Sequence, residues 1–270
     1  MHSLYKHHPN EPFKYTPMRL KSFLLSLFYP RTCPMCEEYI GECEAGKEIP
    51  NGSLCSQCLA ELPRTEQAEI RENLTEMALT GTNSLFVRDT GQQMVRVKKA
   101  MHLERAAAFL FFDKEDPIRD VVHIMKYKDR PEIGYQLGRQ AAMEMQYADF
   151  FDEIDVIVPM PLHPRRMDER GYNQSEYIAR GISEVTGIPV DTTHVTRIKN
   201  TPQQAKQRGR DRKDNVEGAF AVNHPEQMYH KHILLVDDLM TTGETAKSCL
   251  RAMKRFRGAK FSVFALCKAR

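Results

Sequence analysis

Residues 233–245 read ILLVDDLMTTGET, and the rest of the chain is interpreted outward from this stretch. The apolar run 233–236 is too short for a helix and is typical of a strand buried on both faces, which we expect to turn at Asp237. A polar Thr-Thr-Gly loop follows, and then a segment whose apolar residues share one helical stripe: Ala246, Cys249, Leu250, Met253 and Phe256. The stretch therefore predicts a strand, a polar loop and a helix.

The loop between this strand and helix has the composition of a phosphate site. Backbone N–H groups in the first turn of a helix lack partners and lie at the positive end of the helix dipole, so anions bind there. The dipole contributes about 0.3–1 kcal/mol, whereas each charge-assisted hydrogen bond contributes about 1.5–3 kcal/mol. Direct donation therefore dominates, and the candidate donors are threonine hydroxyls beside a glycine that lets the backbone come close: Thr241, Thr242, Gly243 and Thr245.

Two carboxylates next to a phosphate site would repel the anion unless they bind something else. An ionised aspartate only accepts hydrogen bonds, and the 2′,3′-diol of a ribose offers two donors. Asp237 and Asp238 are therefore predicted to hold ribose hydroxyls, while Glu244 must point its charge away from the phosphate. The alternative interpretation is a surface turn with two solvated aspartates.

The apolar strand, the acid pair and TTGET together resemble the phosphoribosyl pyrophosphate loop of type I phosphoribosyltransferases. The chain has neither a Walker A loop nor a dinucleotide-binding glycine fingerprint. The resemblance implies an α/β fold with a mainly parallel sheet and flanking helices. It also implies that the loop binds phosphoribosyl pyrophosphate, with the two aspartates as catalytic residues: Asp237, Asp238, Met240, Thr241, Thr242, Gly243, Glu244 and Thr245.

Two CxxC pairs separated by eighteen residues predict a structural tetrathiolate zinc site, with Cys33, Cys36, Cys55 and Cys58 as ligands. The alternative is two disulfides in a secreted protein. No export signal is evident, and Cys249 and Cys267 remain as unpaired thiols, so we expect a reducing, cytoplasmic compartment. Cys43 is a fifth thiol between the two pairs, either a substitute ligand or a free thiol.

The composition is that of an ordinary globular protein, with 270 residues, 41% apolar and 28% charged, and a net charge of +3. No apolar stretch reaches the roughly 20 residues that a membrane span needs. Four segments are predicted: a disordered extension (1–19), an amphipathic helix with the four-cysteine zinc module (20–62), a connector (63–82) and the phosphoribosyltransferase-like domain (83–270).

Hydrophobic patterns predict further strands at 83–88, 106–112, 154–160 and 261–267. Asp116 followed by Pro117 indicates the start of a helix, and Pro131 starts another. Asn173 with Glu176 forms a capping box for a third helix, which runs to Gly187. Strands alternating with helices favour a parallel sheet.

Three arginines follow the 154–160 strand within what we expect to be a loop: Arg165, Arg166 and Arg170. If the strands are parallel, this loop and the aspartates share the carboxyl edge of the sheet, where open α/β sheets bind ligands. Arginine suits bidentate recognition of phosphate, so these residues are candidates for the pyrophosphate group. A solvated basic loop is the alternative.

Residues 199–217 contain almost no apolar residue and are expected to form a mobile loop or lid. By resemblance to the flexible loop of phosphoribosyltransferases, its polar residues would close over the pyrophosphate: Gln203, Gln204, Arg208 and Arg212. An exposed basic segment that contacts a polyanion such as nucleic acid is the alternative.

The order of the CxxC pairs, KYKDR, VPMPLHPRRMDERGYNQ, TPQQAKQR and ILLVDDLMTTGET resembles that of the ComF family of amidophosphoribosyltransferase-like proteins, over about residues 20–270. Members of that family are associated with natural competence, and others with gluconate use. The resemblance implies single-stranded DNA and a competence helicase as partners.

The implied reaction transfers phosphoribose with Mg²⁺ on the pyrophosphate, the aspartates stabilising positive charge at the sugar. Lys126 and Tyr127 are candidates for contacting the acceptor, which the sequence does not identify. Two other classes stay open: a non-catalytic sensor of phosphoribosyl pyrophosphate, and a zinc-containing adaptor that binds single-stranded DNA. The sequence gives no indication of the oligomeric state.

Overall fold

The computed structural model describes residues 32–40, 54–70, 72–80, 86–88, 94–96, 103–113, 115–128, 130–199 and 218–270. Five predictions lie wholly or mostly outside these residues: the extension at 1–19, the amphipathic helix that follows it, the role of Cys43, the first half of the strand at 83–88, and the mobile loop at 199–217.

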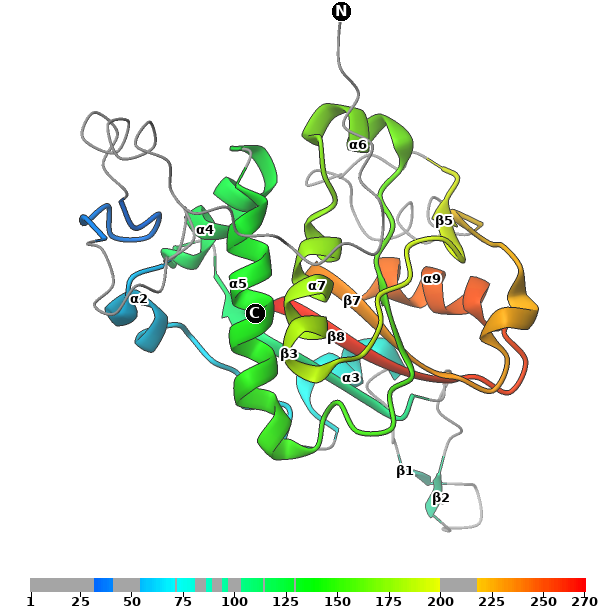
Figure 1. The fold of residues 1–270 in the computed structure, drawn as a ribbon. Coiled ribbons are helices and arrows are strands. Elements are labelled where there is room, and N and C mark those ends of the chain that lie inside the picture. The colour runs from blue at the N-terminus through cyan, green and yellow to red at the C-terminus, as the bar shows by residue number, and fades with distance from the viewer. Residues whose placement is uncertain are drawn as a thin grey trace, which may run out of the picture.

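A four-stranded parallel sheet forms the centre of the protein (Figure 1). The strand order β3-β8-β7-β4 places the strand that carries the aspartates in the interior of the sheet. The strands are β3 (Arg105–Phe112), β4 (Val156–Pro159), β7 (His232–Met240) and β8 (Lys260–Ala269). The expected α/β class with a mainly parallel sheet is therefore confirmed, and the near-continuous apolar runs are explained by burial on both faces.

The sequence predicts that the strand β7 turns at Asp237, but this prediction is wrong. The strand continues to Met240 because β8 continues beside it, with Asp237 opposite Ala265 and Met240 opposite Lys268. On its other side the pairing with β4 ends at Val236. Among the described strands, none lies beside β7 on that side beyond this point, so the last residues of β7 have one open edge.

Helices cover both faces of the sheet. One buried cluster joins α4, α5 and α7 to Leu234 and Val236 of β7, and a second joins α9 to Ile233 and Leu235. The apolar stripes predicted for α4, α5 and α9 are buried. The bounds of these helices are α4 (Ile118–Tyr127), α5 (Pro131–Met145), α7 (Gln174–Thr186) and α9 (Glu244–Met253).

The helices α5 and α7 pack side by side through two glycines (Figure 1). A Cβ atom on Gly181 would lie 2.0 Å from the carbonyl oxygen of Tyr135, and one on Gly138 would lie 2.3 Å from that of Ile178. Each distance is far inside van der Waals contact. Any larger residue at these two positions would force the helix axes apart.

The segment that follows β4 was expected to be a loop, but it contains the helix α6 (Pro164–Arg170). Pro164 occupies the first turn, where its missing N–H is not needed. The His163 ring accepts a hydrogen bond from the N–H of Arg165 at 3.2 Å, and Gly171 ends the helix at φ +76°. These local signals permit one short helix although the segment is polar.

The remaining elements are short. The strands β1 (Phe86–Arg88) and β2 (Met94–Arg96) form one antiparallel pair, and β5 (Val195–Arg197) and β6 (Phe220–Val222) form another. The remaining helices are α2 (Ser56–Ala60), α3 (Leu74–Thr80), η1 (Gln146–Ala148) and η2 (Pro225–Met228).

An arm formed by residues 63–70 runs along the outer edge of β3. The N–H of Thr65 donates to the carbonyl of Phe109 at 3.0 Å, and the N–H of Phe111 donates to the carbonyl of Pro63 at 2.7 Å. The arm lies within the segment expected to connect the cysteine module with the main domain. The division of the chain into those domains remains a prediction.

Candidate functional site

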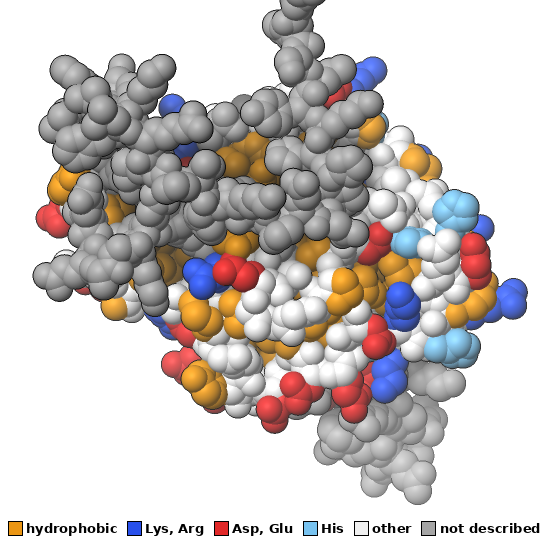
Figure 2. Space-filling model, viewed as in Figure 1, with side chains coloured by type: hydrophobic (Ala, Val, Ile, Leu, Met, Phe, Trp, Pro, Cys, Tyr) orange, Lys and Arg blue, Asp and Glu red, His pale blue; other side chains and the backbone are white. Residues whose placement is uncertain are grey.

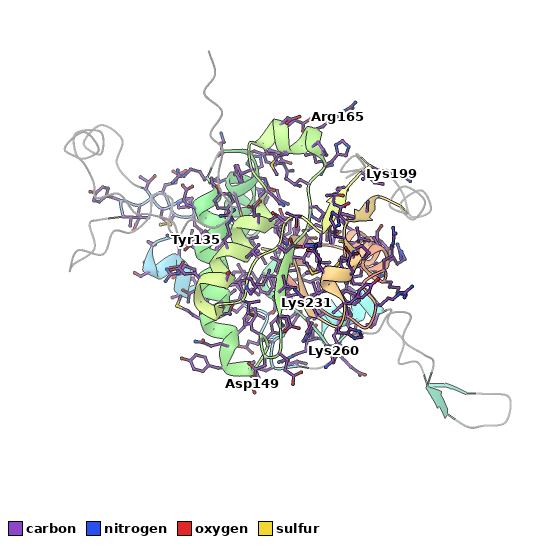
Figure 3. All side chains as sticks on the ribbon, turned by 45° about the vertical axis from the view of Figure 1, so that its right-hand side comes forward. Tyr135, Asp149, Arg165, Lys199, Lys231 and Lys260 are labelled. Atoms are coloured by element: carbon purple, nitrogen blue, oxygen red, sulfur yellow. The ribbon has the colours of Figure 1, made fainter. Side chains whose placement is uncertain are left out.

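The carboxyl end of the sheet brings the predicted site residues together. Figure 3 shows Arg165 at the top of the molecule with Lys199 near it, whereas Lys231, Lys260 and Asp149 follow in that order towards the bottom. Lys231 precedes β7 and Lys260 begins β8, so the second group marks the amino end of the strands. Arg165 therefore lies at the carboxyl end, the edge at which open α/β sheets bind ligands.

The two aspartates of β7 point to opposite faces of the sheet. Side chains alternate along a strand, and Leu235 packs with α9 whereas Val236 packs with α4, α5 and α7. Asp238 accordingly meets the α4 face, where its Oδ2 lies 2.9 Å from Nζ of Lys126. Asp237 faces α9 and interacts electrostatically with Arg197 of β5.

The protonation of Asp237 is unusual for a carboxyl group. Burial and the neighbouring charge of Asp238 raise the pKa of Asp237 to about 7, although Lys126 and Arg197 oppose this increase. A carboxyl group with such a pKa exchanges its proton near neutral pH. The two aspartates therefore point to opposite faces, and the pKa of Asp237 lies near neutral pH.

The loop 241–243 joins β7 to α9 as expected. Thr241 and Thr242 are exposed, and Gly243 adopts a left-handed conformation with φ +77°. A Cβ atom on Gly243 would lie 3.2 Å from Leu79 of α3, so α3 supports the loop from below. The Lys268 ammonium donates to the carbonyl of Thr241 at 2.9 Å and fixes the other side.

Three further residues of the predicted loop have distinct surroundings. Met240 is buried, and Thr245 is half-buried in the first turn of α9. Glu244 accepts a hydrogen bond from Lys247 at 2.9 Å, so its charge is compensated by a lysine one turn along the helix.

The three arginines lie on α6 with different exposures. Arg165 is exposed, whereas Arg166 and Arg170 are half-buried. Arg170 donates to Gln174 at 3.0 Å, and its guanidinium lies 5.2 Å from the ring centroid of Tyr127. This contact joins α6 to the end of α4.

Lys126 and Tyr127 diverge at the end of α4. Lys126 is buried and points to Asp238, whereas the side chain of Tyr127 is 56% exposed beside Arg170. Of this pair, only Tyr127 presents its side chain to the surface. Gln203, Gln204, Arg208 and Arg212 of the expected lid lie outside the described residues.

Arg197 is a residue of this site that is not among the predicted site residues. Its guanidinium lies 5.5 Å from the ring centroid of Phe220. Burial and Arg166 lower the pKa of Arg197, while Asp237 opposes this decrease. The available signal was its place at the end of a short apolar strand, directly before the polar segment.

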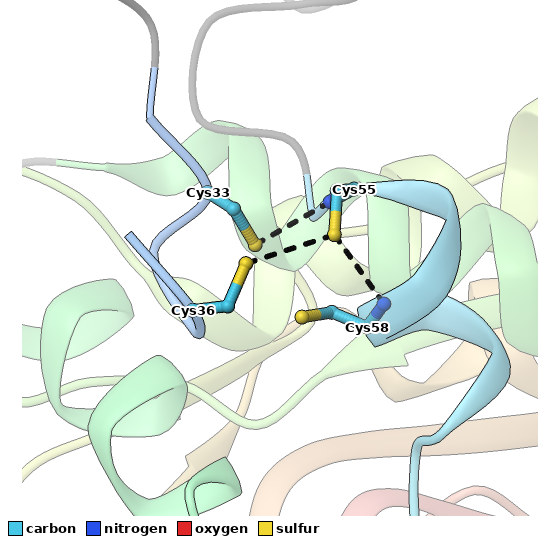
Figure 4. Close-up of side chains that lie close together, drawn as sticks. All are labelled: Cys33, Cys36, Cys55 and Cys58. Atoms are coloured by element: carbon cyan, nitrogen blue, oxygen red, sulfur yellow. Dashed lines mark hydrogen bonds between the residues drawn. The ribbon is translucent and has the colours of Figure 1, made fainter. Parts of the chain in front are cut away.

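The four cysteines predicted as metal ligands converge at the surface near α2 (Figure 4). Their sulfur atoms all lie within 4.8 Å of one another, and Sγ of Cys36 is 3.8 Å from Sγ of Cys55. Four thiolates at this separation form a donor set that suits tetrahedral zinc. Among the described residues this is the one His, Cys, Asp and Glu cluster with metal-ligand geometry.

The thiols of this cluster differ in acidity. Burial alone would raise the pKa of Cys33, but hydrogen bonds from the backbone N–H groups of Cys55, Cys36 and Met35 lower it to about 7. Burial and the three neighbouring thiols raise the pKa of Cys58. A bound cation would remove the repulsion that keeps the last thiols protonated.

Arg64 joins the helix α2 of the cysteine cluster to the helix α5. Its guanidinium donates to both carboxylate oxygens of Glu144 on α5, at 2.5 and 2.7 Å. The same group donates to backbone carbonyls of Leu59, Ala60 and Leu62 at the end of α2. One side chain therefore caps α2 and binds α5.

The fold and the site define a phosphoribosyltransferase-like protein: a parallel sheet whose central strand carries two aspartates and leads through a Thr-Thr-Gly loop into a helix. The amidophosphoribosyltransferase of Haemophilus influenzae is 30% identical to this chain over 164 residues, which cover 58% of this chain and 28% of that enzyme. No family model matches the chain.

Two other relatives match much more of their own length. DNA utilization protein YhgH of Escherichia coli is 32% identical over 159 residues, or 58% of this chain and 69% of that protein. Competence protein F of Haemophilus influenzae is 28% identical over 159 residues, which cover 57% of this chain and 69% of that protein. The chain belongs to the ComF family, which includes these two proteins. Within the described residues, no helix is both long and apolar enough to cross a membrane.

Proposed function

We propose that the chain binds phosphoribosyl pyrophosphate with Mg²⁺ and transfers its phosphoribosyl group to a nucleophile. The observation that carries the proposal is the open edge of β7 beyond Val236, where Asp237 and Asp238 flank the strand from its two faces. A sugar seated against this edge can be reached by one carboxylate from each side. Side chains pointing to opposite faces are thus compatible with a shared diol.

The residues around this edge have separate tasks in the proposed reaction. The 5-phosphate lies at loop 241–243 and the first turn of α9, where backbone N–H groups and threonine hydroxyls donate. Arginines 165, 166 and 170 bind the pyrophosphate, whose charge Mg²⁺ neutralises, and the 203–212 segment closes over it. As pyrophosphate leaves, the fixed aspartates stabilise the positive charge that develops at the sugar.

The acceptor is proposed to approach from the side of Tyr127. Its exposed ring is supported by the Arg170 guanidinium and by His123, whose ring centroid is 4.9 Å away. An aromatic surface of this kind suits a flat or weakly polar acceptor.

The experiment measures binding of phosphoribosyl pyrophosphate with Mg²⁺ by calorimetry and release of pyrophosphate with a panel of bases and amines. Asp238→Asn is expected to reduce affinity at least about tenfold, because it removes a charged acceptor. Asp152→Asn is the control, since Asp152 is exposed and its N–H bonds to Asp149 at the opposite end of the sheet. Absence of binding to the wild-type protein would reject the proposal, and binding without turnover would identify a sensor.

A role in DNA use is proposed as well, because the relatives are named for DNA utilization and competence. In that role the protein would act in the cytoplasm during DNA uptake, with single-stranded DNA and a helicase as partners. On the face drawn in Figure 2, acidic and basic side chains of the described residues are interspersed. The proposed DNA contact is the segment 199–213, because it is rich in lysine and arginine, and affinity should fall steeply with salt. Failure to bind DNA at low salt would exclude direct contact.

The cysteine cluster is proposed to hold a structural zinc ion. Its four sulfur atoms supply the complete tetrahedral ligand set, which leaves no position for a substrate. Metal analysis of the purified protein should give one zinc per chain.

A further inference from the structure

We infer that Lys126 is a positioning residue for the sugar site, which holds the carboxylate of Asp238 in place and compensates its charge before any ligand arrives. This inference rests on the proposed function, because it explains how the acid pair is kept ready for a sugar diol. It assigns to Lys126 a role through Asp238 rather than through direct contact with the substrate.

The first support is the geometry of the pair. Nζ of Lys126 lies 2.9 Å from Oδ2 of Asp238, and the two side chains are only 7% and 14% exposed. A buried ion pair at this distance leaves the carboxylate little freedom to rotate. One carboxylate oxygen is occupied by the ammonium group, so the other is left to accept a hydrogen bond from a ligand.

The second support is that Lys126 itself is fixed. The preceding residue, Met125, is fully buried, and its carbonyl accepts a hydrogen bond from the hydroxyl of Tyr172. The Cβ position of Gly134 on α5 lies 3.1 Å from the Met125 sulfur. The last turn of α4 is thus held by the segment after α6 and by α5.

The third support is the charge around Asp238. Lys126 of α4 and Cys267 of β8 lie on this side of the sheet, and Asp237 of β7 acts from the opposite face. Arg170 interacts electrostatically with Lys126, and Asp116 with Cys267. Burial and Asp238 raise the pKa of the Cys267 thiol, which therefore stays neutral.

Lys126 is the cation that forms an ion pair with Asp238 in the described part of the site. Burial would lower the pKa of Lys126, but Asp238 and Asp237 raise it, so the ammonium form is retained. Without Lys126, Asp237 would lose a cation that opposes the rise of its pKa, and Asp238 would lose its ion-pair partner.

The test compares Lys126→Met with Lys128→Met. Lys128 lies two residues further along the chain, is exposed, and loses the same charge in the control. Affinity for phosphoribosyl pyrophosphate with Mg²⁺ is measured at pH 6.5 and 8.5. Relative to the wild-type protein, Lys126→Met is expected to bind at least about tenfold more weakly at pH 6.5 and to recover most of this loss at pH 8.5. The control should keep the wild-type ratio.

A loss that is equal at both pH values would show a merely structural role and overturn the inference, as would wild-type affinity in Lys126→Met. The ligand-free protein gives a second readout, the carboxyl ¹³C signals of labelled aspartates, assigned with Asp237→Asn and Asp238→Asn. The titration of Asp237 should move to higher pH in Lys126→Met but not in Lys128→Met, because Lys126 opposes the rise of its pKa. This measurement can be made even if the wild-type protein does not bind the sugar. Failure of the proposed function can therefore be distinguished from failure of this inference.

A folding defect in Lys126→Met is also informative. Removing one partner of a buried ion pair leaves an uncompensated charge, whereas replacing both partners is often tolerated. Lys126→Met combined with Asp238→Asn should therefore fold and melt close to the wild-type temperature. If the double variant also fails to fold, Lys126 is required for packing and the inference is wrong.

Discussion

Gly181→Ala is expected to destabilise the protein by about 3 kcal/mol, the upper part of the range for an overpacked core. The added Cβ would lie 2.0 Å from the carbonyl oxygen of Tyr135 and 2.9 Å from the N–H nitrogen of Arg139. Ordinary van der Waals contact begins at 3.4 Å, so the methyl group is more than an ångström too close to backbone that cannot rotate away. The gain in helix propensity of about 1 kcal/mol offsets part of the cost.

The control for this prediction is Gly187→Ala at the end of the same helix. Gly187 has φ +73° and no atom within 4 Å of its Cβ position, so alanine there meets only backbone strain. That strain costs about 1–2 kcal/mol. Urea unfolding followed by far-ultraviolet circular dichroism gives both values, with an unchanged m-value as the sign that only stability has changed. Equal or smaller destabilisation by Gly181→Ala would refute the close crossing of α5 and α7.

Arg64→Met should cost about 2–3 kcal/mol in calorimetric unfolding, because it breaks a two-point bond to Glu144 and leaves the end of α2 uncapped; Glu144→Gln, which keeps the shape, should cost less. Chelation of metal from the cysteine cluster should lower the melting temperature, and added zinc should restore it. Burial lowers the pKa of His232 below 6.5, its value in the unfolded chain. The free energy of unfolding should therefore be undiminished above pH 6.5 and decline as the pH falls below it. His232→Gln should flatten this slope. The pKa of Asp237 is raised from 3.8 to about 7, so the free energy of unfolding should decrease as the pH rises through that interval. Asp237→Asn should remove this decrease.

The sequence predicts well where periodicity and burial decide the structure. The apolar run 233–236 becomes the centre of the sheet because helices cover both of its faces. The helix at Pro131 is recognisable because its stripe, with Ile133 and Leu137, meets a single buried cluster. Asp116 also acts as expected, since its carboxylate accepts the N–H of Ile118 at 3.0 Å.

The sequence predicts poorly where contacts with a segment distant in the chain determine the local structure. Nothing local shows that β7 runs past its acidic residues, because the cause is the parallel partner β8. Because β7 continues as a strand, Asp237 and Asp238 point to opposite faces of the sheet. A turn at Asp237 would not predict this arrangement. The bond between Lys126 and Asp238 joins residues that lie far apart in the chain, and no periodic pattern reports such a pairing.

The arm along β3 has a consequence for shortened forms of the protein. β3 reads RAAAFLFF and is the outermost strand on its side of the sheet. A chain beginning after residue 73 would lose the backbone partners of this strand and present unpaired amide groups on an apolar ribbon. Such edges recruit strands from other molecules. Removing residues 1–73 should therefore yield aggregates rather than a smaller monomer.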